Sequence, residues 1–167
     1  MEGRHGIGDE HPYSHIIMIF CGILFASIWG LDSFIFHFGV EFTNNIHVII
    51  RVVLFVLASG LSIKLGMSSH DVIFDHQEES SCLITDGVFS HVRHPMYLSI
   101  LLLKLGFLLL TMSLISIIPW VICIILYDKI ASFEERELIK ILGEEYVEYM
   151  KEVPRWIPKF LTLNKPR

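Results

Sequence analysis

The strongest constraint on this chain is a series of long segments that are almost free of charged side chains. Residues 12–31 contain no Asp, Glu, Lys or Arg, residues 42–63 contain only Arg51, and residues 96–127 contain only Lys104. A helix needs about 20 apolar residues to cross the roughly 30 Å hydrocarbon core of a bilayer. Helices in soluble cores are rarely apolar on all sides for so long. The pattern predicts an all-α integral membrane protein.

The lengths of these segments set the number of spans. We predict the first span at residues 15–36 and the second at about residues 46–66. The 32 residues of 96–127 would form a helix of about 48 Å, which is too long for one span and too short for two complete ones. We therefore predict four transmembrane helices, the last two forming a helical hairpin over residues 96–133 that turns near Thr111.

The distribution of Lys and Arg predicts the orientation. Eight of the thirteen such residues lie between positions 129 and 167, and none lies in the connection 32–46. The positive-inside rule then places the C-terminal tail, 134–167, in the cytoplasm. With four spans the N-terminal tail, 1–14, and the loop 67–95 are cytoplasmic as well. We interpret the chain as one domain whose two most polar segments meet on the cytoplasmic side.

Composition excludes several classes of function. The net charge of −5 argues against a nucleic-acid partner, which usually requires a basic face. Three cysteines do not make a disulfide framework. His91 and His94 have helical i,i+3 spacing but precede a proline, and no Cys or carboxylate cluster completes a ligand set, so no metal is expected. The first fourteen residues carry both acids and bases, unlike a cleavable signal.

The tail predicts an amphipathic helix from about residue 127 to residue 150. Its apolar stripe comprises Ala131, Leu138, Leu142, Tyr146 and Tyr149. Glu135 falls within that stripe and Glu134 lies at its edge. An acid on a buried stripe is costly unless it has a partner, so Glu135 is a candidate for binding a cation or acting as a base. The alternative is that the Glu pair only solvates a helix face.

A polar segment directly precedes the third predicted span. Asp86-Gly87 signals a turn, and Arg93-His94-Pro95 follows it. Pro95 can open the next helix, which would leave Arg93 and His94 beside the positive end of that helix. This arrangement suits a carboxylate or another anionic ligand group. The alternative is a basic residue at the membrane edge with a histidine whose ring reaches toward water.

The spacing of these segments resembles a known family. Gly87-Val88-Phe89, three residues, then Arg93-His94-Pro95-Met96-Tyr97, are followed by Glu134-Glu135 and by Gly143-Glu144-Glu145-Tyr146. This combination is similar to the isoprenylcysteine carboxyl methyltransferase family, and the related phospholipid N-methyltransferases share much of it. The resemblance covers residues from about 60 to 160, and a closing Val153-Pro154 with Pro158 also matches.

The resemblance implies S-adenosylmethionine as cofactor, held at the cytoplasmic membrane face, and a lipophilic methyl acceptor that arrives from the bilayer. The implied cofactor-binding residues are Ser81, Cys82, Leu83, Ile84, Phe89, His94, Pro95, Met96, Tyr97 and Glu134. Arg93 and Glu135 are implied as catalytic residues. Phe89 stands where the family usually has Tyr, which keeps an aromatic wall and loses a hydroxyl group. Carboxylate, guanidinium and aromatic groups suit the cationic, anionic and ring parts of that cofactor.

One departure keeps the identity of the acceptor open. Where isoprenylcysteine enzymes carry an Arg, this chain has Ile130, with Lys129 beside it as a candidate for binding the acceptor. Phospholipid N-methylation is therefore an alternative. A non-catalytic small channel or transport subunit is another, and it predicts a polar path near Arg51 and Lys104. Charges inside spans are functional candidates by default, although Lys104 can also extend its side chain toward the interface.

Overall fold

A computed structural model describes residues 13–38, 40–75 and 83–158, and these residues form helices and connections without a strand. The helices are α1 (Ser14–Leu31), a π-helical turn (Asp32–Phe36), α2 (Val40–Asn45), α3 (Val48–Asp75), a 3₁₀ turn (Gly87–Ser90), α4 (Pro95–Thr111), α5 (Ile117–Leu142) and α6 (Glu144–Glu152). The all-helical fold class is confirmed.

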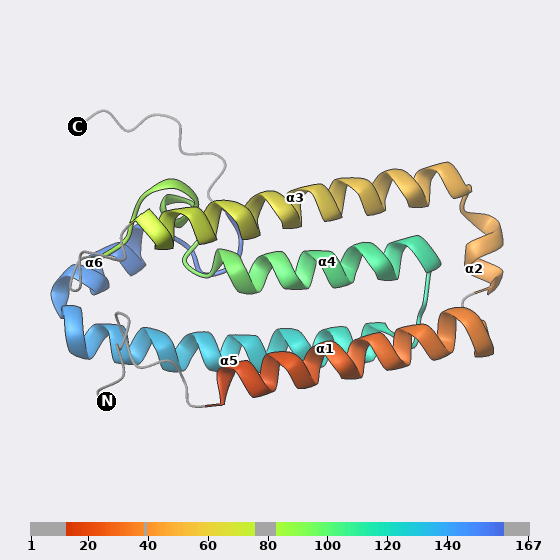
Figure 1. Ribbon diagram of the computed structural model, residues 1–167, viewed down its shortest axis with the longest axis horizontal. Coiled ribbons are helices and arrows are strands. Elements are labelled where there is room, and N and C mark those ends of the chain that lie inside the picture. The colour runs from red at the N-terminus through yellow and green to blue at the C-terminus, as the bar shows by residue number, and fades with distance from the viewer. Residues whose placement is uncertain (1–12, 39, 76–82, 159–167) are drawn as a thin grey trace.

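The four long helices lie side by side, with α3 packed along α4 and α1 packed along α5 (Figure 1). Short α2 and the turn between α4 and α5 lie at one end of this bundle. The connection into α4 and helix α6 lie at the other end (Figure 1). The two segments at that end are in contact, because the hydroxyl of Tyr149 donates a hydrogen bond to the carbonyl of Phe89 at 2.6 Å.

Two helices are long and apolar enough to cross a membrane. They cover Ser14–Phe36 and Val48–Val72, and only 17% and 11% of their most apolar windows are buried inside the protein. The core helix of a soluble protein would be mostly buried, whereas these helices expose a continuous apolar surface. Helix α4, Pro95–Thr111, is apolar but shorter. The structure thus has two candidate membrane spans and a shorter apolar helix packed on the second.

The turn between α4 and α5 lies where the sequence predicts it. Helix α4 ends at Thr111, and Met112 adopts the left-handed conformation with φ 52°. Helix α5 starts at Ile117 with Pro119 buried in its first turn, a position where proline costs no hydrogen bond.

Arg51 satisfies the free carbonyl groups at the end of α4. Its Nη1 atom donates to the carbonyl of Leu110 at 2.9 Å, and the hydroxyl of Thr43 donates to the carbonyl of Thr111 at 3.1 Å. The last carbonyl groups of a helix have no hydrogen-bond partner within the helix, and these two side chains supply the missing donors. This contact gives Arg51 a structural role at the end of α4.

Lys104 points into the bundle instead of extending toward its end. Its side chain is buried, Nζ donates to the hydroxyl of Tyr127 at 3.2 Å and lies 5.3 Å from the centre of that ring. Cys21 and Cys123 are buried free cysteines in the same core cluster as Tyr127. Lys104 and Arg51 are thus engaged in separate local contacts.

Two predicted boundaries are wrong. The second apolar helix continues to Asp75, nine residues beyond the predicted end at Gly66, so the predicted loop 67–95 starts with two turns of helix. The helix runs through Gly66, which faces Ser99 of α4; a Cβ atom there would lie 3.5 Å from the Ser99 hydroxyl, an ordinary contact distance. No proline follows to end the helix earlier.

The predicted single tail helix over residues 127–150 is also wrong. Helix α5 runs without a break from Ile117 to Leu142, so the predicted boundary at residue 134 falls inside it. Gly143 then takes φ 62°, and α6 starts at Glu144. Glycine adopts this backbone conformation at little cost, which explains why the helix ends there and the chain turns back toward the bundle.

We predict that Gly106→Leu destabilises the contact between α3 and α4. A Cβ atom at Gly106 would lie 3.4 Å from atoms of Phe55, Ala58 and Ser59. Overpacking of this kind costs about 1–3 kcal/mol of unfolding free energy. Gly60→Leu is the matched control, because a Cβ atom there meets nothing within 4 Å. Thermal unfolding in detergent measures both, and equal melting temperatures for the two variants would contradict the packing.

Candidate functional site

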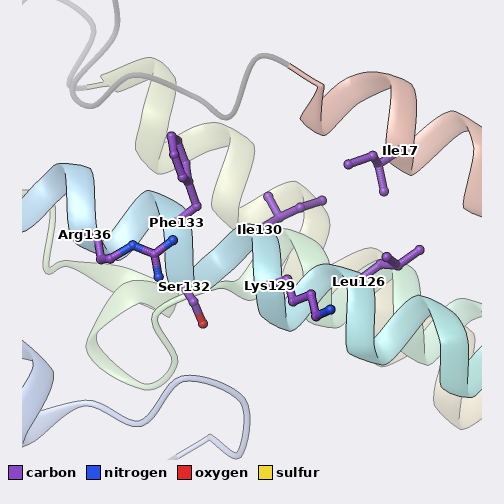
Figure 2. A pocket seen from close by; sticks show the side chains of 7 residues that line it. All are labelled: Ile17, Leu126, Lys129, Ile130, Ser132, Phe133 and Arg136. Carbon is purple, nitrogen blue, oxygen red and sulfur yellow. The ribbon is translucent and has the colours of Figure 1, made fainter.

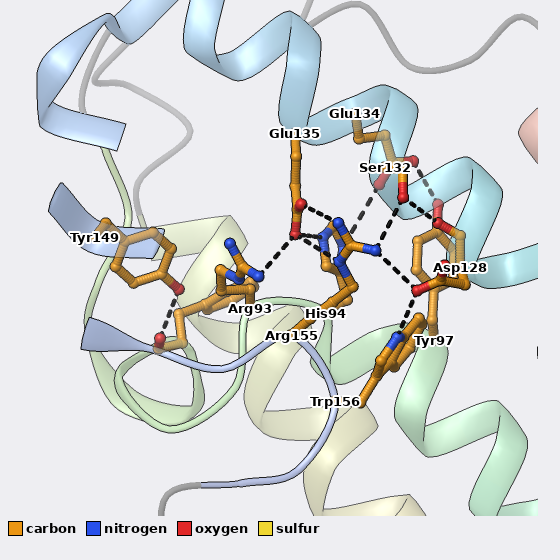
Figure 3. Close-up of polar contacts among 11 residues, drawn as sticks. Arg93, His94, Tyr97, Asp128, Ser132, Glu134, Glu135, Tyr149, Arg155 and Trp156 are labelled. Atoms are coloured by element: carbon orange, nitrogen blue, oxygen red, sulfur yellow. Dashed lines mark hydrogen bonds and ion pairs between the residues drawn. The ribbon is translucent and has the colours of Figure 1, made fainter. Parts of the chain in front are cut away.

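A buried carboxylate lies at the end of the bundle where the polar segments meet (Figure 3). Glu135 of α5 is 2% exposed. Arg155 binds this carboxylate through two nitrogens. Its Nε atom donates a hydrogen bond to Oε1 at 3.0 Å, and its Nη2 atom donates one to Oε2. His94 Nε2 lies 3.2 Å and Arg93 Nη2 3.4 Å from the same Oε1 atom. Glu135 has the partners that its place on the apolar stripe requires.

His94 joins Glu135 to the neighbouring Glu134. Its Nδ1 atom lies 3.6 Å from Oε2 of Glu134, and the hydroxyl of Tyr97 donates to the other oxygen of that carboxylate. Both ring nitrogens of His94 therefore face carboxylates. The imidazole also stacks on Tyr97, with ring centres 5.8 Å apart, and lies 6.1 Å from the ring of Trp156.

We call the cluster of Arg93, His94, Tyr97, Glu134, Glu135 and Arg155 the polar centre. Arg155 extends it to Asp128, which lies two helical turns before Glu135 on the same face of α5. Its Nη1 atom donates to Asp128 at 2.8 Å and to the hydroxyl of Ser132 at 2.9 Å. The indole of Trp156 donates to the same Asp128 oxygen at 2.9 Å. The segment after α6 is therefore fixed to α5 by charge-assisted hydrogen bonds.

Local backbone geometry positions Arg93 and His94. Pro95 is the first residue of α4, and His94 before it has φ −123° and ψ 63°, outside the helical region, as expected for a residue that precedes proline. The amide of Arg93 donates to the carbonyl of Pro154 at 3.0 Å, which ties this segment to the chain before Arg155. Upstream, Gly87 makes the predicted turn with φ 56°.

The centre stabilises the ionised form of Glu135. Burial by itself raises the pKa of this carboxyl, but hydrogen bonds from His94 and Arg155 and the positive charge of Arg93 outweigh it and hold the pKa at about 2. The hydrogen bond to Glu135 in turn raises the pKa of the Arg155 guanidinium above its ordinary value. Both partners of this ion pair are charged throughout the neutral pH range.

Arg93 retains hydrogen-bonding capacity for a ligand. Its side chain is 10% exposed, and only Nη2 approaches Glu135. The Nε and Nη1 atoms are buried and find no acceptor among the described residues. A buried donor without an acceptor costs about 1–3 kcal/mol, and a guanidinium edge is well suited to a carboxylate. These atoms fit a bound anionic group.

The structure brings together Arg93, His94, Tyr97, Glu134 and Glu135, with Pro95 buried at the start of α4. Phe89 contributes its carbonyl, which accepts the hydrogen bond from α6.

The remaining expected residues lie around this centre or outside the described part. Leu83 packs on the apolar cluster of α6, and Ile84 is half-buried. Met96 is 46% exposed at the start of α4. Ser81 and Cys82 lie outside the described residues.

Lys129 lies apart from Glu135, on an open groove between α1 and α5 (Figure 2). This groove encloses about 430 Å³ and is lined by Ile17, Leu126, Lys129, Ile130, Ser132, Phe133 and Arg136. The structure therefore separates the expected acceptor residue from the expected cofactor residues.

His91 and His94 do not converge on one point. His91 Nδ1 lies 2.8 Å from the Ser90 hydroxyl and 3.2 Å from the carbonyl of Gly87, whereas His94 faces the two glutamates. Within the described ranges, no three His, Cys, Asp or Glu side chains are grouped so that they could hold a metal ion.

Sequence reasoning missed four members of the polar centre, namely Asp128, Ser132, Arg155 and Trp156. Asp128 and Ser132 share the face of Glu135 and could have been found from helical spacing alone. Arg155 and Trp156 lie between Pro154 and Pro158, in the segment after α6. The available signal for them is that a buried Glu135 with no cationic partner close to it in the sequence requires an Arg from another segment.

Comparisons with known proteins agree on one family. A family profile described as Phospholipid methyltransferase matches residues 46–145. The chain is 28% identical over 107 residues to "Protein-S-isoprenylcysteine O-methyltransferase" of Schizosaccharomyces pombe, which covers 61% of this chain and 44% of that protein. It is 30% identical over 104 residues to "Protein-S-isoprenylcysteine O-methyltransferase B" of Arabidopsis thaliana, covering 62% of this chain and 53% of that protein.

The chain thus spans about half the length of the curated relatives that it matches. The Homo sapiens "Protein-S-isoprenylcysteine O-methyltransferase" is 28% identical over 94 residues, which make up 56% of this chain and 33% of that protein. Residues 46–145 include α3, α4, α5 and most of the polar centre, whereas Arg155 and Trp156 lie beyond them.

We predict that Arg155→Met strongly destabilises the protein. Removing one partner of a buried ion pair leaves the other charge buried and costs about 3–5 kcal/mol of unfolding free energy. Lys140→Met is the matched control, because Lys140 pairs with Glu137 on the surface and such a pair contributes at most about 1 kcal/mol. Chemical unfolding in detergent measures both losses, and losses of equal size would contradict the role of Arg155.

We also predict that the stability of the folded protein depends on pH through the ionisation of Glu135. Its pKa is lowered from 4.5 to about 2 in the folded protein, so its stabilisation is complete above pH 4.5 and is lost as the pH falls toward 2. The melting temperature of the wild type should therefore exceed that of Glu135→Gln most at neutral pH. This difference should shrink during acidification below pH 4.5; a constant difference would be inconsistent with an ionised Glu135.

Proposed function

The chain belongs to the phospholipid methyltransferase family, and from this premise we propose that it transfers a methyl group from S-adenosylmethionine to a lipophilic acceptor at the membrane. The names of its relatives support the reaction class, since they are O-methyltransferases that act on protein S-isoprenylcysteine. The observation that carries the proposal is the Arg93 side chain beside the Glu134–Glu135 pair, because its buried Nε and Nη1 atoms find no acceptor in residues 13–38, 40–75 and 83–158.

The polar centre offers a complementary group for each charged part of the proposed cofactor. Arg93 has donors for the carboxylate of the methionine moiety. Glu134, held by Tyr97 and His94, offers negative charge for a cationic group. Tyr97 and Phe89 supply aromatic surface for the adenine ring. Leu83 and Ile84 supply backbone and apolar contacts, and we extend the same assignment to Ser81 and Cys82.

The chemistry proposed here depends on alignment more than on acid or base catalysis. When bound, S-adenosylmethionine supplies a methyl group on a sulfonium sulfur, which an acceptor atom attacks in line. The chain's part is to orient and to exclude water. Glu135 is held by Arg155 and in turn contacts His94 and Arg93, so we assign it a role in positioning these two side chains. We assign Arg93 a ligand-binding role.

We propose four spans, with α4 and the first half of α5 completing the bundle begun by α1 and α3. Helix α5 starts at Ile117 and continues through Glu135, so in this arrangement it leads from one membrane face to the polar centre. The Lys and Arg bias of residues 129–167 supports a cytoplasmic location for the polar centre and for both termini.

Phospholipid N-methylation is the second candidate. The description of the matching family, Phospholipid methyltransferase, names a phospholipid as the acceptor. In addition, Ile130 is apolar and 3% exposed at the position where isoprenylcysteine enzymes carry Arg. Product analysis with a labelled methyl donor distinguishes an ester from a methylated amine, because mild base hydrolyses only the ester.

Binding of S-adenosylhomocysteine tests the proposal directly. Isothermal titration of the detergent-purified protein should give saturable binding, and Glu134→Gln and Arg93→Met should each weaken it at least about tenfold. Glu137→Gln is the matched control, because Glu137 pairs with surface Lys140 outside the polar centre, and it should bind like the wild type. Absence of binding to the wild type at about 1 mM ligand would refute the proposed function.

A further inference from the structure

We propose that the hydroxyl of Tyr146 on α6 and the guanidinium of Arg93 bind the same anionic group, which is the carboxylate of the methyl donor. Tyr146 then makes the site selective for a donor with an intact amino-acid carboxylate. This inference rests on the proposed function and adds a cofactor-binding residue to it. It also brings α6 into the cofactor site, since none of the expected site residues lies on this helix.

The turn at Gly143 brings one face of α6 back to the segment that carries Arg93. Residues at helical spacing on this face form a buried cluster, namely Tyr146, Tyr149 and Val153. Tyr149 anchors the face through its hydrogen bond to the carbonyl of Phe89 at 2.6 Å. Beyond α6, the carbonyl of Pro154 accepts a hydrogen bond from the amide of Arg93 at 3.0 Å. Helix α6 is therefore held against this segment from both sides.

Arg93 offers donors that its protein contacts leave unused. Its side chain is 10% exposed, so bulk water has little access to it. Nη2 lies 3.4 Å from Glu135, whereas the buried Nε and Nη1 atoms find no acceptor in the part of the chain that the structure describes. Figure 3 shows Arg93 between Glu135 and Tyr149 of α6. The unused donors thus belong to a side chain that has α6 as a neighbour.

Tyr146 places a second unused donor beside Arg93. It is 3% exposed, and its hydroxyl forms no hydrogen bond with residues 13–38, 40–75 or 83–158. Burial raises the pKa of this phenol, Glu135 raises the pKa further and Arg93 opposes the increase, so the hydroxyl lies within electrostatic reach of both side chains. The hydroxyl is protonated at neutral pH and can donate a hydrogen bond.

The neighbouring ring of Tyr149 orients Tyr146. The two ring centres lie 5.7 Å apart with their planes inclined at 53°, and Tyr149 is itself fixed by its bond to Phe89. Contacts of this kind limit the orientations that a buried ring can take. The Tyr146 hydroxyl is therefore held in place without a hydrogen bond of its own, as expected for a group that is ready to bind a ligand.

The chemistry of these donors selects an ionised carboxylate as their partner. A carboxylate only accepts hydrogen bonds, and a guanidinium and a phenol both supply donors to it. The negative charge of Glu134, held by Tyr97 and His94, lies on the other side of the glutamate pair. An amino acid carries its carboxylate and its ammonium on one carbon atom. Cationic and anionic subsites that adjoin each other match that end of the proposed methyl donor.

A pair of matched ligands tests the carboxylate assignment. S-adenosylhomocysteine and its decarboxylated analogue share the adenosine, the sulfur and the amine, and only the first has a carboxylate. In isothermal titration the wild type should bind S-adenosylhomocysteine at least about tenfold more tightly than the analogue. Tyr146→Phe should weaken binding of S-adenosylhomocysteine about tenfold and change the affinity for the analogue less than about twofold.

Tyr149→Phe is the matched control, because it removes the other tyrosine hydroxyl of the same cluster. This variant should keep the preference for S-adenosylhomocysteine. Without ligand it should melt at a lower temperature than the wild type, since it loses the bond to Phe89. Tyr146→Phe should melt like the wild type without ligand, and S-adenosylhomocysteine should raise its melting temperature less than that of the wild type.

Three results would overturn the inference. They are equal losses of affinity for both ligands in Tyr146→Phe, loss of the preference in Tyr149→Phe, and a wild type that binds the two ligands equally well. Each of these leaves the proposed function standing, because the wild type still binds S-adenosylhomocysteine. A wild type that does not bind S-adenosylhomocysteine contradicts the proposed function itself.

Discussion

The buried carboxylate of Glu135 is the interaction on which the rest of this end of the protein depends. A lone carboxylate in such a place would be costly, and the cationic partners of Glu135 offset that cost. Those partners come from segments far apart in the sequence, Arg93 and His94 before α4 and Arg155 after α6. The polar centre therefore ties together three segments that lie far apart in the sequence.

Helix α5 connects this centre to the opposite end of the bundle. It runs without interruption from the turn after α4 to Gly143, so the glutamates are carried on a rigid element instead of a loop. One face of α5 presents Asp128 and Glu135 to the closing segment, and another presents Lys129 and Arg136 to the groove beside α1.

Local signals in the sequence were sufficient for much of this arrangement. Pro95 predicted where α4 begins, and the placement of Glu135 on an apolar stripe predicted a buried acid that needs partners. The family predicted from Arg93–Tyr97 and the glutamate pair is confirmed. Gly143 was overlooked as a helix end because the apolar stripe continues across it. Arg155 was missed because its partner lies 20 residues away and only the turn of the chain after α6 brings them together.

The central claim is that the Glu135 centre positions a methyl donor beside a lipophilic acceptor. The most direct measurement incubates the purified protein with methyl-labelled S-adenosylmethionine and a membrane lipid and lipoprotein extract, and then counts label in the organic phase. Label should increase with time for the wild type and fall to background for Arg93→Met. Label no higher than in a protein-free control, from wild-type protein that binds S-adenosylhomocysteine, would contradict it.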